Sequence, residues 1–550
     1  MSFKKSLPST QPHRFSQVPG ADIQRSRFDR SHGYKTTFDA SYLIPVYLDE
    51  VLPGDTFAMK PTVLARLNTP LHPIMDNLYL DTFFFFVPLR LIWDNFEKFM
   101  GARIPDPDSS VDFVVPRLDS VDKTYTGAGT LANYFGIPPG RDISGTIAPV
   151  SCLPFRAYNL IWNEWFRDQN LQDSVDVLTD DGPDPIADYA LLKRGKRHDY
   201  FTSALPWAQK GDPVTIGLGG IFPVEPTGTL AGTDSPEFAH YSGGVPVWSR
   251  GLYSQSTANN PPVYFFGAGA TAPAAEAVWG KTALQVDTSS GAGTTINDLR
   301  QAFTLQQFLE KDARGGTRYT EIISSHFSVR SPDARLQRPE FLGGGSRPVN
   351  ITPLASSAET ERPSDDTLLR NVGDLGAVGM AVSQEGGFHK SFTEHGYIIG
   401  LISVRADLTY QQGMARHWFR QTRYDYFWPV FAHLGEQAIT NKEIWVTDGG
   451  TDSQLNDPWG YQERYAEYRY HPSRITGLFQ SDEAQSLDTW HLAQDFAALP
   501  PLAAAFIEED VPIDRVVAVT SEPDFYLDSY FKLHCARPMP VYGVPGLRRL

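Results

Sequence analysis

The chain has 550 residues, 41% of them hydrophobic, which is ample for a sizeable buried core. Its net charge of −16 argues against a protein that coats nucleic acid with its whole surface. The two cysteines, Cys152 and Cys535, lie far apart, so folding cannot depend on a disulfide framework. Gly (45) and Pro (42) interrupt the chain at short intervals, and this pattern predicts many strands joined by turns and loops.

Residues 1–34 look like an extended arm, with little periodicity and much Pro, Ser, Arg and Gln. Residues 1–35 contain seven basic and two acidic residues, a net charge of +5, which leaves −21 for the rest of the chain. A basic arm on an acidic body indicates either a segment that meets an anionic partner or a solvated, disordered terminus. The segment has no apolar stretch of the kind found in secretory signals.

Two segments after the arm are predicted to be strands. Apolar and polar residues alternate from Thr36 to Phe57, and the sequence Pro-Gly-Asp at 53–55 predicts a turn there. Further on, Phe83–Phe86 are four consecutive Phe residues in a run that ends at Pro88. Such a run predicts a strand that is buried on both faces and lies between two layers.

Few helices are expected. Five aromatic residues recur at helical spacing and form one stripe, which is more typical of a core or a subunit contact than of a cofactor site. A second helix is predicted from about Asp298 to Arg314, with Asn297 capping its start and Gly315 its end. The aromatic stripe consists of Phe155, Tyr158, Trp162, Trp165 and Phe166.

Residues 211–297 differ from the rest of the chain. They are dense in Gly, Ala, Ser, Thr and Pro, and they carry two basic and six acidic residues, a net charge of −4. A stretch of this length without regular periodicity indicates a functional insertion or a disordered linker, and its aromatic residues favour an ordered insertion. These aromatic residues include Trp248, Tyr253, Tyr264, Phe265, Phe266 and Trp279.

Strand patterns return after the insertion, at 397–404, at Arg515–Val519 and, more weakly, from Phe525 to His534. Strands at both ends of the chain, with helices and loops between them, predict a mainly β protein. We expect one β-sandwich elaborated by insertions.

No motif for catalysis stands out. The chain has no phosphate-binding loop, no Gly-x-Ser-x-Gly elbow and no His-Glu-x-x-His pair, and its 13 histidines are scattered. The most apolar stretch, Leu78–Trp93, contains charged residues and falls short of the ~20 apolar residues that a membrane span needs. We therefore expect no enzyme activity, no cofactor, no bound metal and no membrane insertion.

Three local clusters leave alternatives open. Asp180, Asp181, Asp184 and Asp188 indicate an acidic turn rather than a calcium site, because their spacing matches no calcium loop. The basic run Lys193–His198 indicates a solvated loop or a partner for acidic surface on a neighbouring subunit, and less strongly a phosphate contact. A third cluster suits stacking on unpaired bases or packing at a protein interface. It consists of Arg420, Arg423, Tyr424, Tyr426, Phe427 and Trp428.

Several long strings resemble the major capsid proteins of the microvirus family, in particular its gokushovirus branch. They are KTTFDASYLIPVYLDEVLPGDTF (35–57), preceded by RSRFDRSH (25–32), then FRAYNLIWNEWFRDQNLQDS (155–174), SPDARLQRPEFLGGGS (331–346), WPVFAHLGEQ (428–437) and YQERYAEYRYHPSRITG (461–477). They extend from the arm into the C-terminal third, and 211–297 is the region where the resemblance informs least.

The resemblance implies an eight-stranded antiparallel jelly roll with long loop insertions and a few short helices, as a single domain over 35–550. It also implies a T=1 icosahedral shell of 60 copies around a circular single-stranded DNA genome. Implied partners are a small basic DNA-binding protein, a minor DNA pilot protein and a bacterial cell-surface receptor. The chain would then reside in the virion, and in the host cytoplasm during assembly.

The resemblance also implies roles for two sets of residues. The insertion 211–297 resembles a surface-projecting loop that meets the host, and the arm resembles an interior segment that contacts packaged DNA. The expected DNA contacts are Lys4, Lys5, Arg14, Arg25, Arg27 and Arg30. The expected receptor contacts are Trp248, Tyr253, Tyr264, Phe265 and Phe266.

Two other classes of protein remain open at this stage. One is a phage tail or receptor-binding protein that engages glycans, although such proteins commonly have repetitive shafts and this chain shows no repeat. The other is a carbohydrate-active enzyme of jelly-roll form, which needs two carboxylates in a cleft. Fold alone supports neither function.

Overall fold

The computed structural model describes residues 24–102, 113–121, 125–140, 143–144, 150–212, 214, 296–314, 321, 325–326, 337–357, 373, 375–446 and 451–542, with short strands between 224 and 286. The chain divides into two compact units. One comprises Met1–Ala208 with Gly315–Leu550, and the other comprises Gln209–Arg314.

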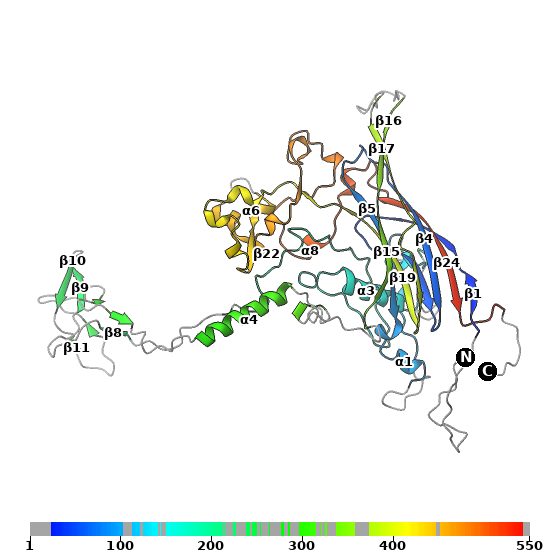
Figure 1. Ribbon diagram of the computed structural model, residues 1–550, viewed down its shortest axis with the longest axis horizontal. Coiled ribbons are helices and arrows are strands. Elements are labelled where there is room, and N and C mark those ends of the chain that lie inside the picture. The colour runs from blue at the N-terminus through cyan, green and yellow to red at the C-terminus, as the bar shows by residue number, and fades with distance from the viewer. Residues whose placement is uncertain are drawn as a thin grey trace, which may run out of the picture. The chain divides into compact units, whose positions relative to one another are not determined.

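The larger unit contains a seven-stranded antiparallel sheet, along one side of the body in Figure 1. Its strands alternate between apolar side chains that face inward and polar ones that face outward, which is the pattern of a sheet with one covered face. The order is β1 (Ser26–Asp29), β24 (Phe525–Arg537), β4 (Thr56–Leu67), β17 (Leu375–Ser383) and β16 (Asn350–Ala355), while β2 (His32–Phe38) also pairs with β24 and β18 (Phe388–Ser391) with β4.

A four-stranded antiparallel sheet packs against the first. Its order is β15 (Glu340–Pro348), β5 (Leu78–Pro88), β19 (Gly396–Ala406) and β3 (Ile44–Val51). Every residue of β19 is buried, and β5 is buried on both faces, as the Phe run predicted. The turn predicted at 53–55 connects β3 to β4, and Gly54 adopts a φ of 90° there, which a glycine tolerates best.

Hydrophobic side chains fill both faces of the four-stranded sheet. Phe84 and Phe86 belong to the core between the two sheets, while Phe85 belongs to a second core on the far face. Burying each such ring contributes about 2 kcal/mol. The second core is closed by α3 (Leu153–Ile161) and the π-helical turn Trp162–Phe166. Of the aromatic stripe predicted as one helix, Phe155, Tyr158 and Trp162 are buried in this core and Phe166 packs against it, whereas Trp165 is 41% exposed.

The long connection between β19 and β24 folds into short elements. It includes β20 (Thr409–Tyr410), β21 (Glu436–Thr440), α6 (Asn441–Ile444), α7 (Asp452–Asn456), β22 (Pro458–Glu463), β23 (Ser473–Arg474) and α8 (Ala504–Ile507). A third core, which includes Tyr200, Phe201 and Trp459, holds much of it together.

The strand predicted at Arg515–Val519 is wrong. A 3-10 turn occupies Ile513–Arg515, and Val516 and Val517 are buried in the core between the sheets without joining a named strand. Arg515 donates instead to the carbonyl oxygens of His491 and Ala493. A short apolar run signals burial, and burial alone does not specify a strand.

The smaller unit contains α4 (Ile296–Arg314), close to the helix predicted from Asp298, although Asn297 lies inside it rather than before it. Gly315 lies outside the described residues. The strands of the smaller unit form three small antiparallel groups. These are β10 (Val245–Ser249), β9 (Phe238–Ser242) and β13 (Ala277–Trp279); β11 (Tyr253–Ser254) and β12 (Val263–Tyr264); and β14 (Leu284–Val286) and β8 (Val224–Pro226).

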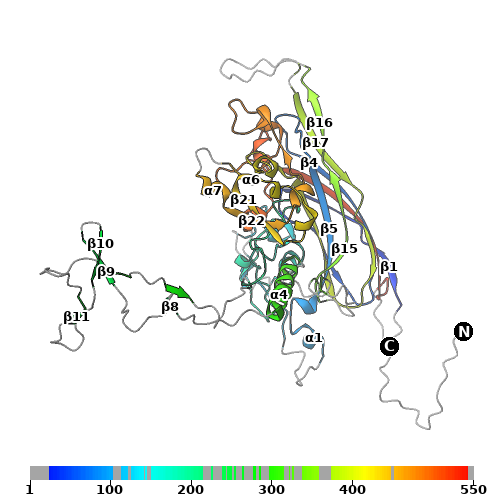
Figure 2. The same ribbon diagram turned by 60° about the vertical axis from the view of Figure 1, so that its left-hand side comes forward.

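The helices of the described part of the chain include none with the length and apolarity to cross a bilayer. Figure 2 shows the β-sheets of the larger unit from a second side, with β1 again at the edge of the body.

Candidate functional site

A concentration of exposed aromatic side chains marks the connection between β19 and β24. Every residue from Gln421 to Val430 is exposed, and Val430 itself is 84% exposed. Contiguous apolar patches of this kind mark contact surfaces, because a soluble monomer gains nothing by exposing them. We call this set the aromatic surface: Trp418, Tyr424, Tyr426, Phe427, Trp428, Val430, Tyr468 and Tyr470.

The aromatic surface is built on short-range hydrogen bonds. Thr422 and Asp425 form a reciprocal capping pair around a 3-10 turn. The indole Nε1 of Trp428 donates to the carbonyl oxygen of Arg423 at 2.8 Å, and the backbone N–H of Phe427 donates to the hydroxyl of Tyr468 at 3.3 Å. The rings are therefore held in place before any partner arrives.

Arginine side chains pack beside the rings of the aromatic surface. The Arg420 guanidinium lies over the rings of Tyr426 and Tyr468, at 5.3 and 4.3 Å from their centroids, and it pairs with Glu467 at 3.3 Å. Arg416 pairs in the same way with the buried Glu443, at 3.1 Å. These carboxylates neutralise Arg416 and Arg420, whereas the exposed Arg423 lies 4.7 Å from the Tyr424 ring centroid and no ion pair joins it to another described residue.

A cavity of about 230 Å³ opens beside the aromatic surface. Its walls combine rings with a few polar groups, including Tyr410, His417, Tyr468, Tyr470 and Arg474. At many protein interfaces, anchor side chains of one partner enter pockets of the other. A cavity next to exposed rings has the features of such an interface. The sequence pattern at 420–428 already pointed to this surface, but it did not reveal the cavity.

The six predicted DNA contacts fall into different environments. Lys4, Lys5 and Arg14 lie outside the described residues, whereas Arg25, Arg27 and Arg30 lie at the edge of the seven-stranded sheet. Since β1 and β2 pair with β24, the sheet begins at Ser26, inside the segment expected to be an arm.

The three described arginines differ in what they contact. Arg30 pairs with Asp49 at 2.6 Å, and Arg25 donates to the carbonyl oxygen of Ala536 at 3.3 Å. Arg27 is exposed, and no ion pair joins it to another of the described residues. Of the three arginines, Arg27 is therefore the one that is available to a ligand.

The predicted receptor contacts belong to the smaller unit. Trp248 lies on β10 opposite Ala239, and Tyr253 pairs across strands with Tyr264. Phe265 and Phe266 lie outside the described residues.

The acidic cluster forms a structural turn. Asp184 is buried against Arg156, while Asp181 accepts hydrogen bonds from the indole Nε1 of Trp93 at 2.7 Å and from Asn95. Within the described ranges, no three His, Cys, Asp or Glu residues are grouped as a metal site requires.

The interpretation of the basic run Lys193–His198 as a solvated loop, or as the partner of a neighbouring subunit, is wrong for its central residues. Arg194 pairs with the buried Asp81 at 2.6 Å, and Lys196 donates to the carbonyl oxygen of Phe506 at 2.8 Å. These partners lie more than a hundred residues away in the sequence, so no local pattern could have identified them.

Comparison with known proteins identifies the family. Residues 16–547 match the family model described as capsid protein (F protein). The chain is 45% identical to the capsid protein VP1 of Chlamydia phage 1, over the full length of both chains. It is 45% identical to VP1 of Bdellovibrio phage phiMH2K, over 97% of each chain, and 37% identical to VP1 of Spiroplasma virus 4, over the full length of both. These matches confirm the resemblance to the gokushovirus branch, and the chain belongs to the phage capsid protein family.

Proposed function

We propose that this capsid protein assembles into a T=1 icosahedral shell of 60 copies that encloses a circular single-stranded DNA genome. The observation that carries the proposal is the aromatic surface, an ordered patch of exposed rings next to a cavity. Contacts between subunits need such surfaces, because the aromatic side chains supply most of the binding energy of an interface.

The strand order supports an eight-stranded jelly roll as the building block. Strands β2, β24, β4 and β17 form one layer, and β3, β19, β5 and β15 form the other. Taken along the chain, successive strands change layer at every step except from β5 to β15, which is the order of two interleaved Greek keys. The insertion at 211–297 falls in the connection between β5 and β15, outside both layers.

Further parts of the proposal concern partners. The insertion would project from the shell and bind a bacterial cell-surface receptor. A small basic DNA-binding protein and a minor DNA pilot protein would join the virion, after assembly in the host cytoplasm. No catalytic step is part of the proposal.

Sedimentation and electron microscopy of the full-length chain test the shell. We expect uniform closed particles or fivefold capsomers. If the chain alone does not form closed particles, it should form them when it is expressed with the other virion proteins. A stable monomer or trimer under those conditions would contradict the proposal and favour a receptor-binding protein.

A matched pair of variants tests the aromatic surface itself. Phe427→Ser with Trp428→Ser removes two rings from it, and we expect particle yield to fall at least tenfold. Tyr542→Ser removes a ring that is 81% exposed elsewhere on the chain, and it should assemble as the wild type does. Equal yields from both variants would exclude the aromatic surface as a subunit contact.

A further inference from the structure

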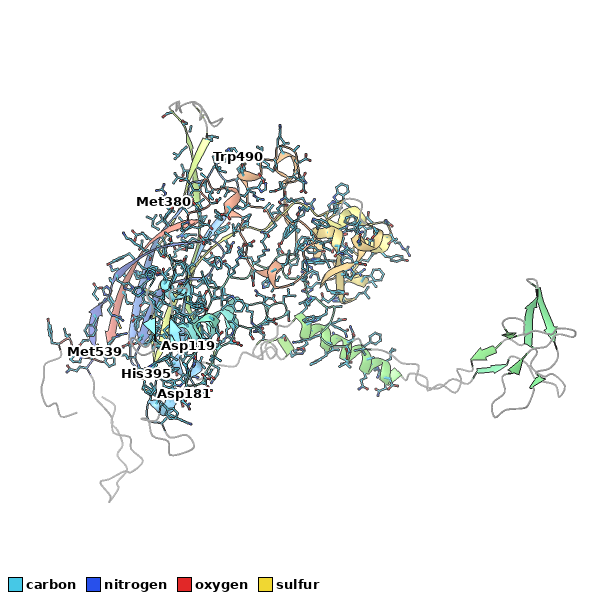
Figure 3. The ribbon with its side chains drawn as sticks, turned by 180° about the vertical axis from the view of Figure 1, so that it is seen from behind. Asp119, Asp181, Met380, His395, Trp490 and Met539 are labelled. Atoms are coloured by element: carbon cyan, nitrogen blue, oxygen red, sulfur yellow. The ribbon has the colours of Figure 1, made fainter. Side chains whose placement is uncertain are left out.

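The outward face of the seven-stranded sheet carries an unusual set of side chains. Residues at alternate positions in the middle of β24 and β4 point away from the core and are exposed, and Figure 1 shows both strands at one side of the body. Met380, labelled in Figure 3, belongs to the same face through β17. The charged and aromatic members of the face are Arg27, Asp29, Lys35, Lys60, Arg66, Tyr526, Asp528, Tyr530 and Lys532.

Two lysines on this face lie directly opposite one another. The register of β24 and β4 pairs Lys532 with Lys60, so the two ammonium groups extend from adjacent strands on the same side. Like charges in directly opposed positions destabilise a sheet. Neither lysine forms an ion pair with another described residue, so their charge is offset only by carboxylates at longer range.

The nearest carboxylates offset this charge in part, since hydrogen bonds from Ser31 and the charge of Lys532 both lower the pKa of Asp29. Asp29 accepts hydrogen bonds from the backbone N–H and the hydroxyl of Ser31, at 3.0 and 2.6 Å. Asp528 lies 3.5 Å from Lys35. The strands of this face thus carry five cations against two carboxylates. Glu522 brings a third carboxylate to the face, where it accepts a hydrogen bond from Tyr526 at 2.6 Å, and the cations still outnumber the carboxylates in a chain whose net charge is −16. This excess of positive charge favours the binding of an anionic ligand.

An exposed ring lies next to the two lysines. Tyr530 is two residues before Lys532 on β24, and its register partner Thr62 is two residues after Lys60 on β4. Side chains two positions apart on a strand share a face and are separated by roughly 7 Å. The Tyr530 ring is 50% exposed, so a planar group can stack on it while a charge next to it meets the lysines.

We propose that this face binds unpaired DNA, with Lys60, Lys532 and Arg27 contacting phosphates and Tyr530 stacking on a base. Alternating cations and rings are what a single strand requires, because its phosphates and its base faces are both accessible. The inference rests on the proposed function, since it names the surface of the shell protein that meets the packaged genome. It also shifts the DNA contact from Arg25 and Arg30 to the sheet face.

Binding of the full-length chain to a fluorescein-labelled oligothymidylate of about 30 nucleotides tests the face. Each phosphate contact contributes about 0.7 to the slope of log affinity against log salt. Lys60→Gln with Lys532→Gln should therefore lower the slope by about 1.4 and weaken binding about 20-fold at 0.1 M salt. Tyr530→Ala should weaken binding about 10-fold, and Tyr530→Phe, which keeps the ring, should not.

The matched control is Arg300→Gln with Lys311→Gln, which removes the same charge from exposed positions of α4. Unchanged slopes for the Lys60 and Lys532 variant, or equal losses in the control, would overturn the proposal. Binding of poly-glutamate that is as tight as that of DNA, with no effect of Tyr530→Ala, would identify the face as a protein contact and also overturn it.

The same variants separate this inference from the proposed function. If wild-type particles form and contain DNA, but the variants lose no DNA affinity, the shell role stands and the sheet face is excluded. If the wild type forms no particles, the shell role fails. The oligonucleotide measurement still tests whether the sheet face binds unpaired DNA.

Discussion

Arg156 and Asp184 form an ion pair in which neither side chain reaches solvent. The guanidinium donates twice, from Nε to Oδ2 at 2.7 Å and from Nη2 to Oδ1 at 2.6 Å. The Tyr189 hydroxyl donates to the same carboxylate, and Nη1 of Arg156 donates to the carbonyl oxygens of Ile92 and Asp180. The pair therefore joins α3 to the acidic turn, where Asp181 is labelled in Figure 3.

Replacing Arg156 by Met should lower the free energy of unfolding by about 3–5 kcal/mol, because Asp184 would remain buried without its counter-charge. Urea denaturation of the dissociated chain measures this change. Lys35→Met is the control, since its ion pair with Asp528 is exposed and should contribute less than about 1 kcal/mol. Equal losses in the two variants would contradict the structural role of the pair.

Stability should fall as pH rises through neutrality because of Glu509. Burial raises the pKa of Glu509 from its ordinary value of 4.5 to about 7, although Arg194, Lys196 and Arg405 act in the opposite direction. Neither carboxylate oxygen has a hydrogen-bond partner among the described residues. The protonated form is therefore the one that the fold favours.

The sign of the effect follows from the raised pKa. The folded state holds the proton of Glu509 more tightly than the unfolded state, so its contribution is complete below pH 4.5 and is lost as pH rises through about 7. The loss should amount to about 3 kcal/mol, and Glu509→Gln should abolish it. Asp524, whose pKa burial raises from 3.8 to about 6, remains in the variant and should leave a decline of similar size that ends nearer pH 6. An unchanged pH profile for Glu509→Gln would show that the side chain titrates normally.

Deleting residues 220–290 should abolish attachment to host cells and leave shells intact. The deleted residues belong to the compact unit Gln209–Arg314, and both sheets lie in the other unit. Co-sedimentation of particles with cells measures attachment, and electron microscopy measures shell integrity. A companion variant with the insertion retained, Trp248→Ser with Tyr253→Ser, should weaken attachment without loss of particles. Undiminished attachment after the deletion would exclude the insertion as the receptor-binding part.

Sequence reasoning succeeded where the pattern was local. The Phe run predicted β5, the apolar run at 397–404 predicted β19, and the periodicity from Asp298 predicted α4, because burial on both faces and helical spacing leave direct marks in a sequence. It failed where the interaction partner of a residue lies far away in the sequence. Nothing near Arg194 indicates Asp81, and nothing near Lys60 indicates that Lys532 is its neighbour in the sheet.

The position of β24 also fixes the order of events during synthesis. This strand, the last in the described chain, lies between β4 on one side and β1 and β2 on the other, so the N-terminal strands acquire their partner only when residues 525–537 have been made. Until then β4 exposes an unpaired edge, which invites association with other nascent chains. The seven-stranded sheet is thus completed only after residues 525–537 have been made, and a chain truncated before them would leave β1, β2 and one edge of β4 without a partner strand.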